Sequence, residues 1–328
     1  MIPFHPLTRN PHLQTILGAF WPRPFDPTTF PVTSHCFDSD TGTRVLLHSQ
    51  TPRTPPNGAL LLLHGLEGSS NGGYMRSAAH AALTAGYAVH RLNTRGCGGT
   101  EALTNTLYHA GLTTDARFVL EHLRQANPQL PLFAAGFSLG ANMILKLAGE
   151  LGPAGPQLLN GIIAVSAPID LHACALALCE PRCRLYQERF VRFMSARLRR
   201  RHQLRPELFA LDKLNGIRSV YEFDDRITAP FFGFGTAQNY YATQSCGLFL
   251  HAIRIPTLLL HAQDDPMIPF HVYDRDVFRT NPHLTLVTPE HGGHVGFLAR
   301  NHPRFFADTL ICHWMHSIGN NRPTSLVL

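Results

Sequence analysis

Short apolar runs recur along the chain and are separated by longer mixed segments that favour helices. Six of the runs predict strands, at residues 59–64, 88–93, 132–135, 161–166, 255–261 and 284–288. The first is apolar up to His64, which is typical of a strand buried on both faces of a parallel sheet. Helices are expected at residues 75–85, 113–126 and 141–148. Because alternating strands and helices form right-handed crossovers, the chain predicts an α/β fold with a mostly parallel central sheet flanked by helices.

The pattern changes between residues 170 and 250, where helical segments occur without a clear strand. We therefore expect a core formed by residues 32–169 and 251–318, with a helical cap inserted at residues 170–250. Within this core, two further strands are expected at residues 34–37 and 44–49 and a last helix at residues 303–318. The last ten residues look frayed.

The first 31 residues carry seven prolines, at positions 3, 6, 11, 22, 24, 27 and 31. Because proline lacks a backbone N–H and fixes its own backbone angle, this density predicts an irregular arm over residues 1–31, packed on the core. Within the arm, the segment Asn10-Pro11-His12-Leu13-Gln14-Thr15 suggests no chemistry from composition alone.

The run at residues 132–135 leads into Gly136-Phe137-Ser138-Leu139-Gly140, and a helix is expected directly afterwards. A Gly-X-Ser-X-Gly turn between a strand and a helix is typical of a nucleophile elbow. The glycines at 136 and 140 allow neighbouring backbones to pass closely. The helix aims its N–H groups and positive dipole end at whatever Ser138 attacks. On these residues alone, an ordinary glycine-rich turn stays an open alternative.

Two other polar residues, Asp265 and His294, also follow apolar strands. In an open parallel sheet the carboxyl ends of the strands form the edge where ligands bind. The order Ser138, Asp265, His294 is that of α/β-hydrolases. His294 would accept the proton of Ser138 and return it to the leaving group, while Asp265 would fix the imidazole tautomer. The backbone N–H groups of Leu66 and Leu139 would bind the oxyanion.

Neighbouring residues compete for these roles. Asp264 precedes Asp265, and we prefer Asp265 because the loop must reach back toward the histidine. His291 competes with His294, and we prefer His294 because the intervening glycines let the loop approach the elbow. His64 is expected to be structural in its loop. No His-Glu-X-X-His spacing occurs, so we predict no catalytic metal, and nothing in the sequence suggests a cofactor.

Composition narrows the class of protein. The chain has 328 residues, 44% of them hydrophobic, and a net charge of +6, but no basic patch interleaved with aromatics, so we expect no nucleic-acid partner. Seven cysteines without a Cys-X-X-Cys pair fit a reducing compartment. We find no signal peptide and no apolar run of the ~18 residues that a membrane span needs. We therefore expect a cytoplasmic protein, of unknown oligomeric state.

An arginine-rich segment, residues 184–205, begins with Arg184 and ends with Arg205. An amphipathic basic helix can lie on an anionic bilayer, so weak peripheral membrane contact is one interpretation. The interpretation we favour is a cap helix whose apolar stripe covers the active site and whose arginines face water.

Several motifs together resemble the YheT-like hydrolases, a branch of the α/β-hydrolase superfamily. They are Asn10 to Thr15, His64-Gly65-Leu66-Glu67-Gly68, Asn93-Thr94-Arg95-Gly96-Cys97, Gly136 to Asn142, Asp264-Asp265-Pro266 and His291-Gly292-Gly293-His294. The resemblance covers about residues 9–315. Two departures, Ala141 for a second glycine and Met267 for an aromatic, leave the triad untouched.

The resemblance implies an α/β-hydrolase fold and a Ser138-Asp265-His294 triad. It also implies hydrolysis of carboxylic esters, with short- to medium-chain acyl or lipid esters as substrates. An acyltransferase or amide hydrolase with the same acyl-serine chemistry stays open, as does a non-catalytic binding protein on this fold.

Overall fold

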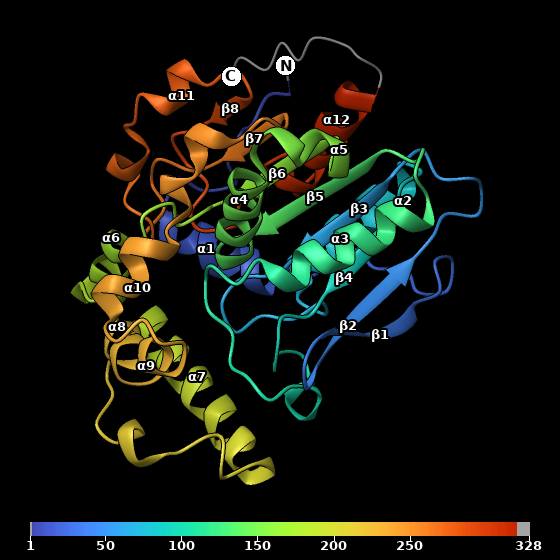
Figure 1. The fold of residues 1–328 in the computed structure, drawn as a ribbon. Coiled ribbons are helices and arrows are strands. Elements are labelled where there is room, and N and C mark those ends of the chain that lie inside the picture. Colours follow the sequence, from blue (N-terminus) through green and yellow to red (C-terminus); the bar gives the residue numbers. More distant parts are fainter. Residues whose placement is uncertain (1, 320–328) are drawn as a thin grey trace.

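A computed structural model describes residues 2–319, and its centre is one eight-stranded sheet (Figure 1). The strand order is β1-β2-β4-β3-β5-β6-β7-β8. The first two strands, β1 (Thr33–Asp40) at the edge and β2 (Thr43–Gln50) beside it, are antiparallel to their neighbours. The six parallel strands are β3 (Ala59–Leu63), β4 (Ala88–Leu92), β5 (Leu132–Phe137), β6 (Gly161–Val165), β7 (Thr257–Leu260) and β8 (Leu284–Val287). The sheet is therefore mostly parallel, as predicted.

Strand β3 shows how the sheet separates two cores. All five of its residues are buried. Leu60 and Leu62 face one core with residues of α2 (Gly73–Thr84) and α12 (Phe306–Gly319). Leu61 and Leu63 face the other core with residues of α3 (Thr114–Ala126) and α4 (Leu139–Leu151). Because successive strand residues point to opposite faces, a strand covered on both sides is apolar throughout.

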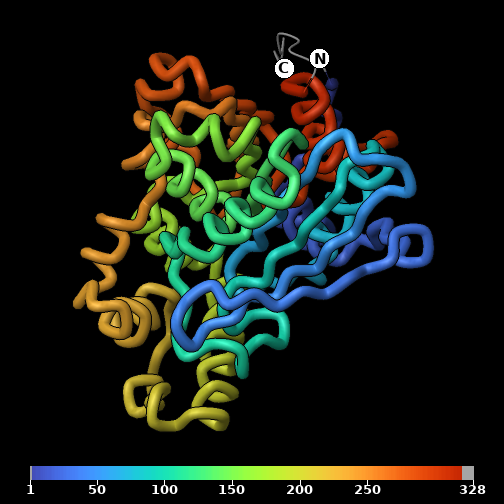
Figure 2. Tube along the Cα trace, turned by 45° about the vertical axis from the view of Figure 1, so that its right-hand side comes forward, coloured from blue at the N-terminus to red at the C-terminus, as the bar shows by residue number. Residues whose placement is uncertain are grey.

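The segment between β6 and β7 is helical, and the structure describes all of it without a strand. Its helices are α6 (Leu171–Leu178), α7 (Arg184–Leu204), α8 (Val220–Phe223), α9 (Ala229–Phe231) and α10 (Ala237–Gln244). Figures 1 and 2 show these helices, yellow-green to orange, projecting beyond one end of the sheet. The predicted division into a core and a cap at residues 170–250 stays a proposal, and the predicted fraying falls almost entirely outside the described residues.

Helix α7 does not turn all its arginines to water, which corrects our expectation. Arg197 and Arg201 are buried together with Met194 and Leu198. The Arg201 guanidinium donates to the Thr104 and Thr106 carbonyls at 3.0 and 2.6 Å and lies over the Phe209 ring. An arginine can bury its aliphatic stem while its guanidinium makes hydrogen bonds. Basic residues of α7 therefore belong to its buried face as well as to its exposed face.

The predicted irregularity of residues 1–31 is wrong in part, because α1 (Pro11–Phe20) is a regular helix. The Asn10 side chain accepts from the Leu13 N–H, and Pro11 occupies the first turn. Asparagine is a preferred N-cap, and proline suits the first turn because its missing N–H would have no helical partner there. The proline that suggested irregularity thus marks the start of the helix.

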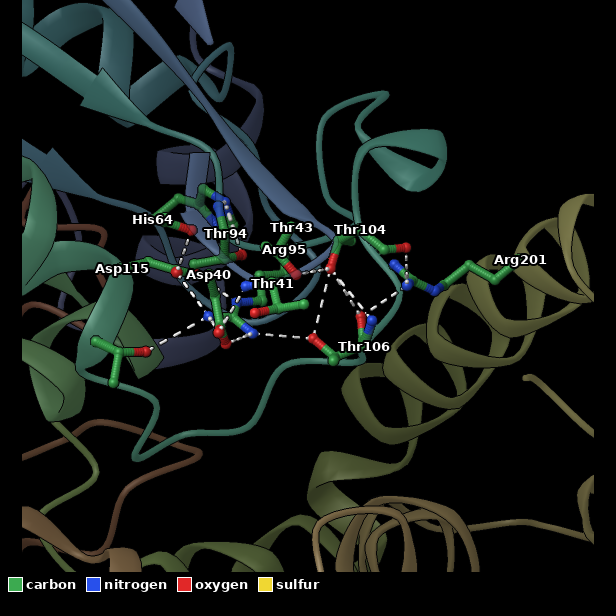
Figure 3. Close-up of polar contacts among 12 residues, drawn as sticks. Asp40, Thr41, Thr43, His64, Thr94, Arg95, Thr104, Thr106, Asp115 and Arg201 are labelled. Carbon is green, nitrogen blue, oxygen red and sulfur yellow. Dashed lines mark hydrogen bonds and ion pairs between the residues drawn. The ribbon is translucent and has the colours of Figure 1, made fainter. Parts of the chain in front are cut away.

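Arg95, from the resemblance motif at residues 93–97, links the edge strand β1 to α3. Its guanidinium donates to both carboxylate oxygens of Asp115, at 2.7 and 2.8 Å, and to Asp40 at 3.3 Å. Figure 3 shows Arg95 between these two carboxylates, with Arg201 reaching Thr104 and Thr106 nearby. The Arg95 and Asp115 side chains are 3% and 7% exposed, so neither charge has water as an alternative partner.

Replacing Arg95 by methionine should lower the free energy of unfolding by about 3–5 kcal/mol, because Asp115 would keep a buried, uncompensated charge. Urea denaturation of Arg95→Met beside wild type measures this loss. Arg117→Met is the control, since its ion pair with Glu121 is exposed and should contribute little. Equal losses in the two variants would contradict the assigned role.

Candidate active site

Ser138 lies on the sharp turn between β5 and α4, with φ 52° and ψ −119°. A side chain rarely adopts this left-handed backbone, so the surroundings must hold it. The flanking glycines show how close these surroundings are. A Cβ at Gly136 would lie 2.3 Å from the Gly140 carbonyl oxygen, and one at Gly140 would lie 2.5 Å from the Leu63 carbonyl oxygen. Only glycine fits at both positions, so the elbow is built by backbone contact.

The structure brings Ser138, Asp265 and His294 into one hydrogen-bonded chain. His294 Nε2 lies 2.9 Å from Ser138 Oγ, and His294 Nδ1 lies 2.8 Å from Asp265 Oδ2. The other oxygen of Asp265 accepts the N–H groups of Met267 and Ile268, at 2.9 and 3.1 Å. With Nδ1–H donating to Asp265, Nε2 is free to accept the serine proton.

The buried carboxyl of Asp265 is held in its ionised form. Burial alone would raise its pKa, but the facing His294 and the hydrogen bonds from His294 and Met267 outweigh burial and lower the pKa below its ordinary value. Its side chain has no exposed surface. An ionised carboxylate at this position can stabilise an imidazolium at His294.

Asp264 and His291, the alternatives to Asp265 and His294 in the sequence analysis, contact each other instead of the serine. Asp264 Oδ2 lies 3.1 Å from His291 Nδ1, and its Oδ1 accepts the N–H groups of Gly292 and Gly293, both at 2.9 Å. Neither Asp264 nor His291 has a hydrogen bond to Ser138 among those found in residues 2–319. Asp264 thus fastens the loop that carries His294.

Two backbone N–H groups are available beside the serine. Leu139 is the first residue of α4, so its N–H has no acceptor within the helix. The N–H of Leu66 makes no hydrogen bond with any described residue, whereas those of Gly65 and Glu67 bind the Tyr74 and Tyr108 hydroxyls. A Cβ at Gly65 would lie 3.1 Å from Ser138 Cβ, so this loop lies directly against the serine. The arrangement suits an oxyanion hole.

His64 supports the Gly65-Leu66 loop through a hydrogen bond. Its Nδ1–H donates to the Gly65 carbonyl at 2.8 Å, and its Nε2 accepts the Thr94 N–H at 3.2 Å. Burial lowers the pKa of His64 to about 4, so the ring is neutral at pH 7 and can accept at Nε2. These contacts fit the structural role expected for His64.

Two cavities meet at the serine. The inner one, ≈ 100 Å³, lies between the elbow and the helices of residues 171–244, and Ala175, Met194 and Asp224 help to line it. The outer one, ≈ 360 Å³, lies between α1 and α7. Both are lined mainly by apolar side chains, and Leu66, Ser138, Phe190, Met267 and His294 border both. A substrate with two arms could therefore place its reactive centre on Ser138.

Sequence reasoning missed the residues that hold the His294 loop from outside. Thr15 Oγ1 accepts the His294 N–H at 2.9 Å, and Ser166 Oγ accepts the Val295 N–H at 3.1 Å. Sequence reasoning also missed Asn142, two residues past the elbow glycine, which links α4 to the Ala110 carbonyl and the Cys246 N–H. Thr15 and Asn142 belong to the resemblance motifs, and this membership was the signal that could have pointed to them.

Within residues 2–319, no group of three or more histidine, cysteine, aspartate or glutamate side chains is arranged to hold a metal ion. The same residues contain no helix long and apolar enough to cross a membrane.

Comparison with known proteins places this chain in a family. Residues 54–295 match the family model described as serine aminopeptidase, S33. The chain is 32% identical to the YheT protein of Escherichia coli (strain K12) over 93% of this chain and 90% of that protein. It is 30% identical to phospholipase ABHD3 of Bos taurus, over 82% of this chain and 64% of the relative. It is 32% identical to a monoacylglycerol lipase of Saccharomyces cerevisiae, over 76% of this chain and 57% of the relative.

Among solved structures, the Pyrococcus furiosus esterase Pf2001 superposes with a TM-score of 0.56 at 15% identity, over 91% of this chain and 96% of that one. At this identity the likeness supports the fold alone. The fold and the family model define an α/β hydrolase. The chain belongs to the α/β-hydrolase family of that model and, within it, groups with YheT. The predicted fold class and family are confirmed, and the names of the relatives agree with the predicted class of enzyme, a carboxylic ester hydrolase.

Asp265→Asn should lower kcat by about 10⁴-fold, because an amide facing His294 Nδ1 favours the wrong tautomer. Asp264→Asn should cost far less, since its amide oxygen can still accept the Gly292 and Gly293 N–H groups. Steady-state hydrolysis of a p-nitrophenyl ester by both variants compares the two. The reverse ranking would move the acid of the triad by one residue.

Proposed function

We propose that this protein is a serine hydrolase that cleaves carboxylic esters, with short- to medium-chain acyl or lipid esters as substrates. The observation that carries the proposal is the continuous chain from Asp265 through His294 to Ser138 at the junction of two apolar cavities. A serine hydroxyl is a weak nucleophile at pH 7 and needs such a base.

The reaction follows from the geometry. His294 Nε2 takes the proton as Ser138 Oγ attacks the ester carbonyl, and the carbonyl oxygen gains the negative charge of a tetrahedral intermediate. The N–H groups of Leu66 and Leu139 bind that oxygen, and removing one such donor typically costs about 3 kcal/mol. His294 then protonates the departing alcohol. Water, activated by the same histidine, releases the acid from the acyl-serine.

We assign the acyl group to the inner cavity, because both oxyanion donors belong to residues that line it. A cavity of ~150 Å³ holds a benzene molecule, so ≈ 100 Å³ limits the acyl group to a few carbon atoms. The outer cavity would then take the alcohol. The helices of residues 170–250 act as a cap in this proposal, because they close the inner cavity. The cytoplasmic location stays a prediction.

Two alternatives keep the same acyl-serine. Transfer of the acyl group to an alcohol would make the protein an acyltransferase, and an amide substrate would make it an amidase. The description of the matching family, serine aminopeptidase, favours testing amides. Product analysis with a competing alcohol tests the acyltransferase. Assays of matched esters and amides test the amidase.

A fluorophosphonate probe should label wild type and leave Ser138→Ala unlabelled, because only an activated serine reacts with it. Labelling of folded Ser138→Ala, or no labelling of folded wild type, would contradict the proposal.

On p-nitrophenyl esters, kcat/KM should fall once the acyl chain outgrows the inner cavity. Ala175→Leu, which fills that cavity, should shift the preference toward acetate. Ala19→Leu, in the outer cavity, is the control and should leave the preference for acyl-chain length unchanged.

We also propose a weak contact with anionic lipid surfaces, through a different surface from the one expected. The buried face of α7 packs on the core and cannot enter a bilayer. Three exposed apolar side chains line the outer cavity: Ile16 and Phe20 on α1 and Leu185 on α7, which are 40%, 72% and 73% exposed. Helix α7 has seven arginines against one glutamate, and the five that are exposed complement an anionic surface.

Wild type should float with vesicles that contain anionic phospholipid at low salt, and less as salt screens the charges. Phe20→Ser and Leu185→Ser should lower the bound fraction. Leu248→Ser is the control, because Leu248 is 48% exposed and lines neither cavity. Absence of a vesicle-bound fraction for wild type at low salt would reject the contact.

A further inference from the structure

Helix α1 is built to press against the loop that carries His294. Its buried residues are Gln14, Thr15 and Gly18. A Cβ at Gly18 would lie 2.6 Å from Gly296 Cα, so the helix and the loop pack backbone against backbone. The segment of residues 10–15, which suggested no chemistry in sequence, therefore lies next to the proposed catalytic base.

The His294 loop has a backbone that needs such support. Gly293, Val295 and Phe297 have φ of 60°, 57° and 40°. Glycine adopts this left-handed region freely, but for a β-branched valine or a bulky phenylalanine it costs of order 1–3 kcal/mol. Such a conformation persists only when the surrounding structure determines it. His294 lies between two of these residues, so the direction of its ring depends on what holds them.

Hydrogen bonds from α1 hold the loop at both ends. Thr15 Oγ1 accepts the His294 N–H at 2.9 Å and donates its own proton to the Pro11 carbonyl at 2.7 Å, which turns a lone pair toward His294. Gln14 has no exposed surface; its Oε1 accepts the Leu298 N–H at 2.9 Å and its Nε2 donates to the Leu298 carbonyl at 3.1 Å. The core adds the bonds to Asp264 and Ser166 described above, and the Phe306 N–H donates to the Phe297 carbonyl at 3.1 Å.

We propose that Thr15, supported by Gln14, is a positioning residue for the base His294. This inference rests on the proposed triad. Thr15 fixes the main chain at His294, and this keeps Nε2 at 2.9 Å from Ser138 Oγ while Nδ1 stays on Asp265. Without the Thr15 acceptor, the strained loop relaxes and the imidazole loses its alignment with the serine. The N-terminal segment is thus part of the apparatus that activates Ser138.

The test compares Thr15→Val, which keeps the shape and loses the acceptor, with Thr15→Ser, which keeps both hydroxyl bonds. A Thr15→Val enzyme should lose about 10- to 100-fold in kcat on a soluble p-nitrophenyl acetate substrate, with KM within about twofold, because small misplacement of a catalytic group costs this much. Thr15→Ser should restore most of the activity. Leu13→Ala, on the exposed face of the same helix, is the control and should match wild type.

Fluorophosphonate labelling separates positioning from folding. A loss of folded protein lowers the final labelled fraction, whereas misplacement of His294 lowers the labelling rate and leaves that fraction intact. We expect the rate of Thr15→Val to fall in parallel with its kcat. A wild-type rate in Thr15→Val, or an equal loss in Thr15→Ser, would overturn the inference while the triad stands. Absence of Ser138 labelling in wild type would overturn the triad and the inference together.

Discussion

The close approach of backbones around Ser138 is the constraint on which the rest of this structure depends. The serine is held at φ 52° between glycines that touch the end of β3 and the first turn of α4. This contact aims the hydroxyl out of the sheet edge and leaves the Leu139 N–H unused at the start of a helix. It also brings the Gly65-Leu66 loop against the serine, so the proposed nucleophile and its two candidate oxyanion donors come from one packing arrangement.

The other two residues of the proposed triad reach the serine because parallel strands end at a common edge. Asp265 follows β7, which lies two strands from β5, and His294 follows β8, which lies three strands from β5. The loops after these strands span the distance to the serine. The loop of His294 is the longer and the more strained, and it is fastened by Asp264, Ser166 and the residues of α1. The rigid part of the candidate site thus lies on the sheet, and the part that needs external support carries the proposed base.

Much of this could be predicted from sequence, because burial on both faces of a sheet forces apolar runs and the polar residues after them fall on one edge. The runs of residues 59–64 and 161–166 coincide with β3 and β6 to within one residue. Ser138, Asp265 and His294 could be selected for the same reason. The helix α1 could not, since the prolines of residues 1–31 suggest irregularity and the N-terminal cap of the helix depends on one asparagine. The buried arginines of α7 and the two cavities depend on tertiary packing, which periodicity does not encode.

A crystal structure of the protein with a butylphosphonate ester on its nucleophile tests the central claim most directly. We expect the adduct on Ser138 Oγ, with the phosphonyl oxygen at hydrogen-bond distance, about 3 Å, from the backbone nitrogens of Leu66 and Leu139 and the butyl chain in the inner cavity. A phosphonyl oxygen turned away from both N–H groups, or an adduct on another side chain, would contradict the assignment of this edge of the sheet as the catalytic site.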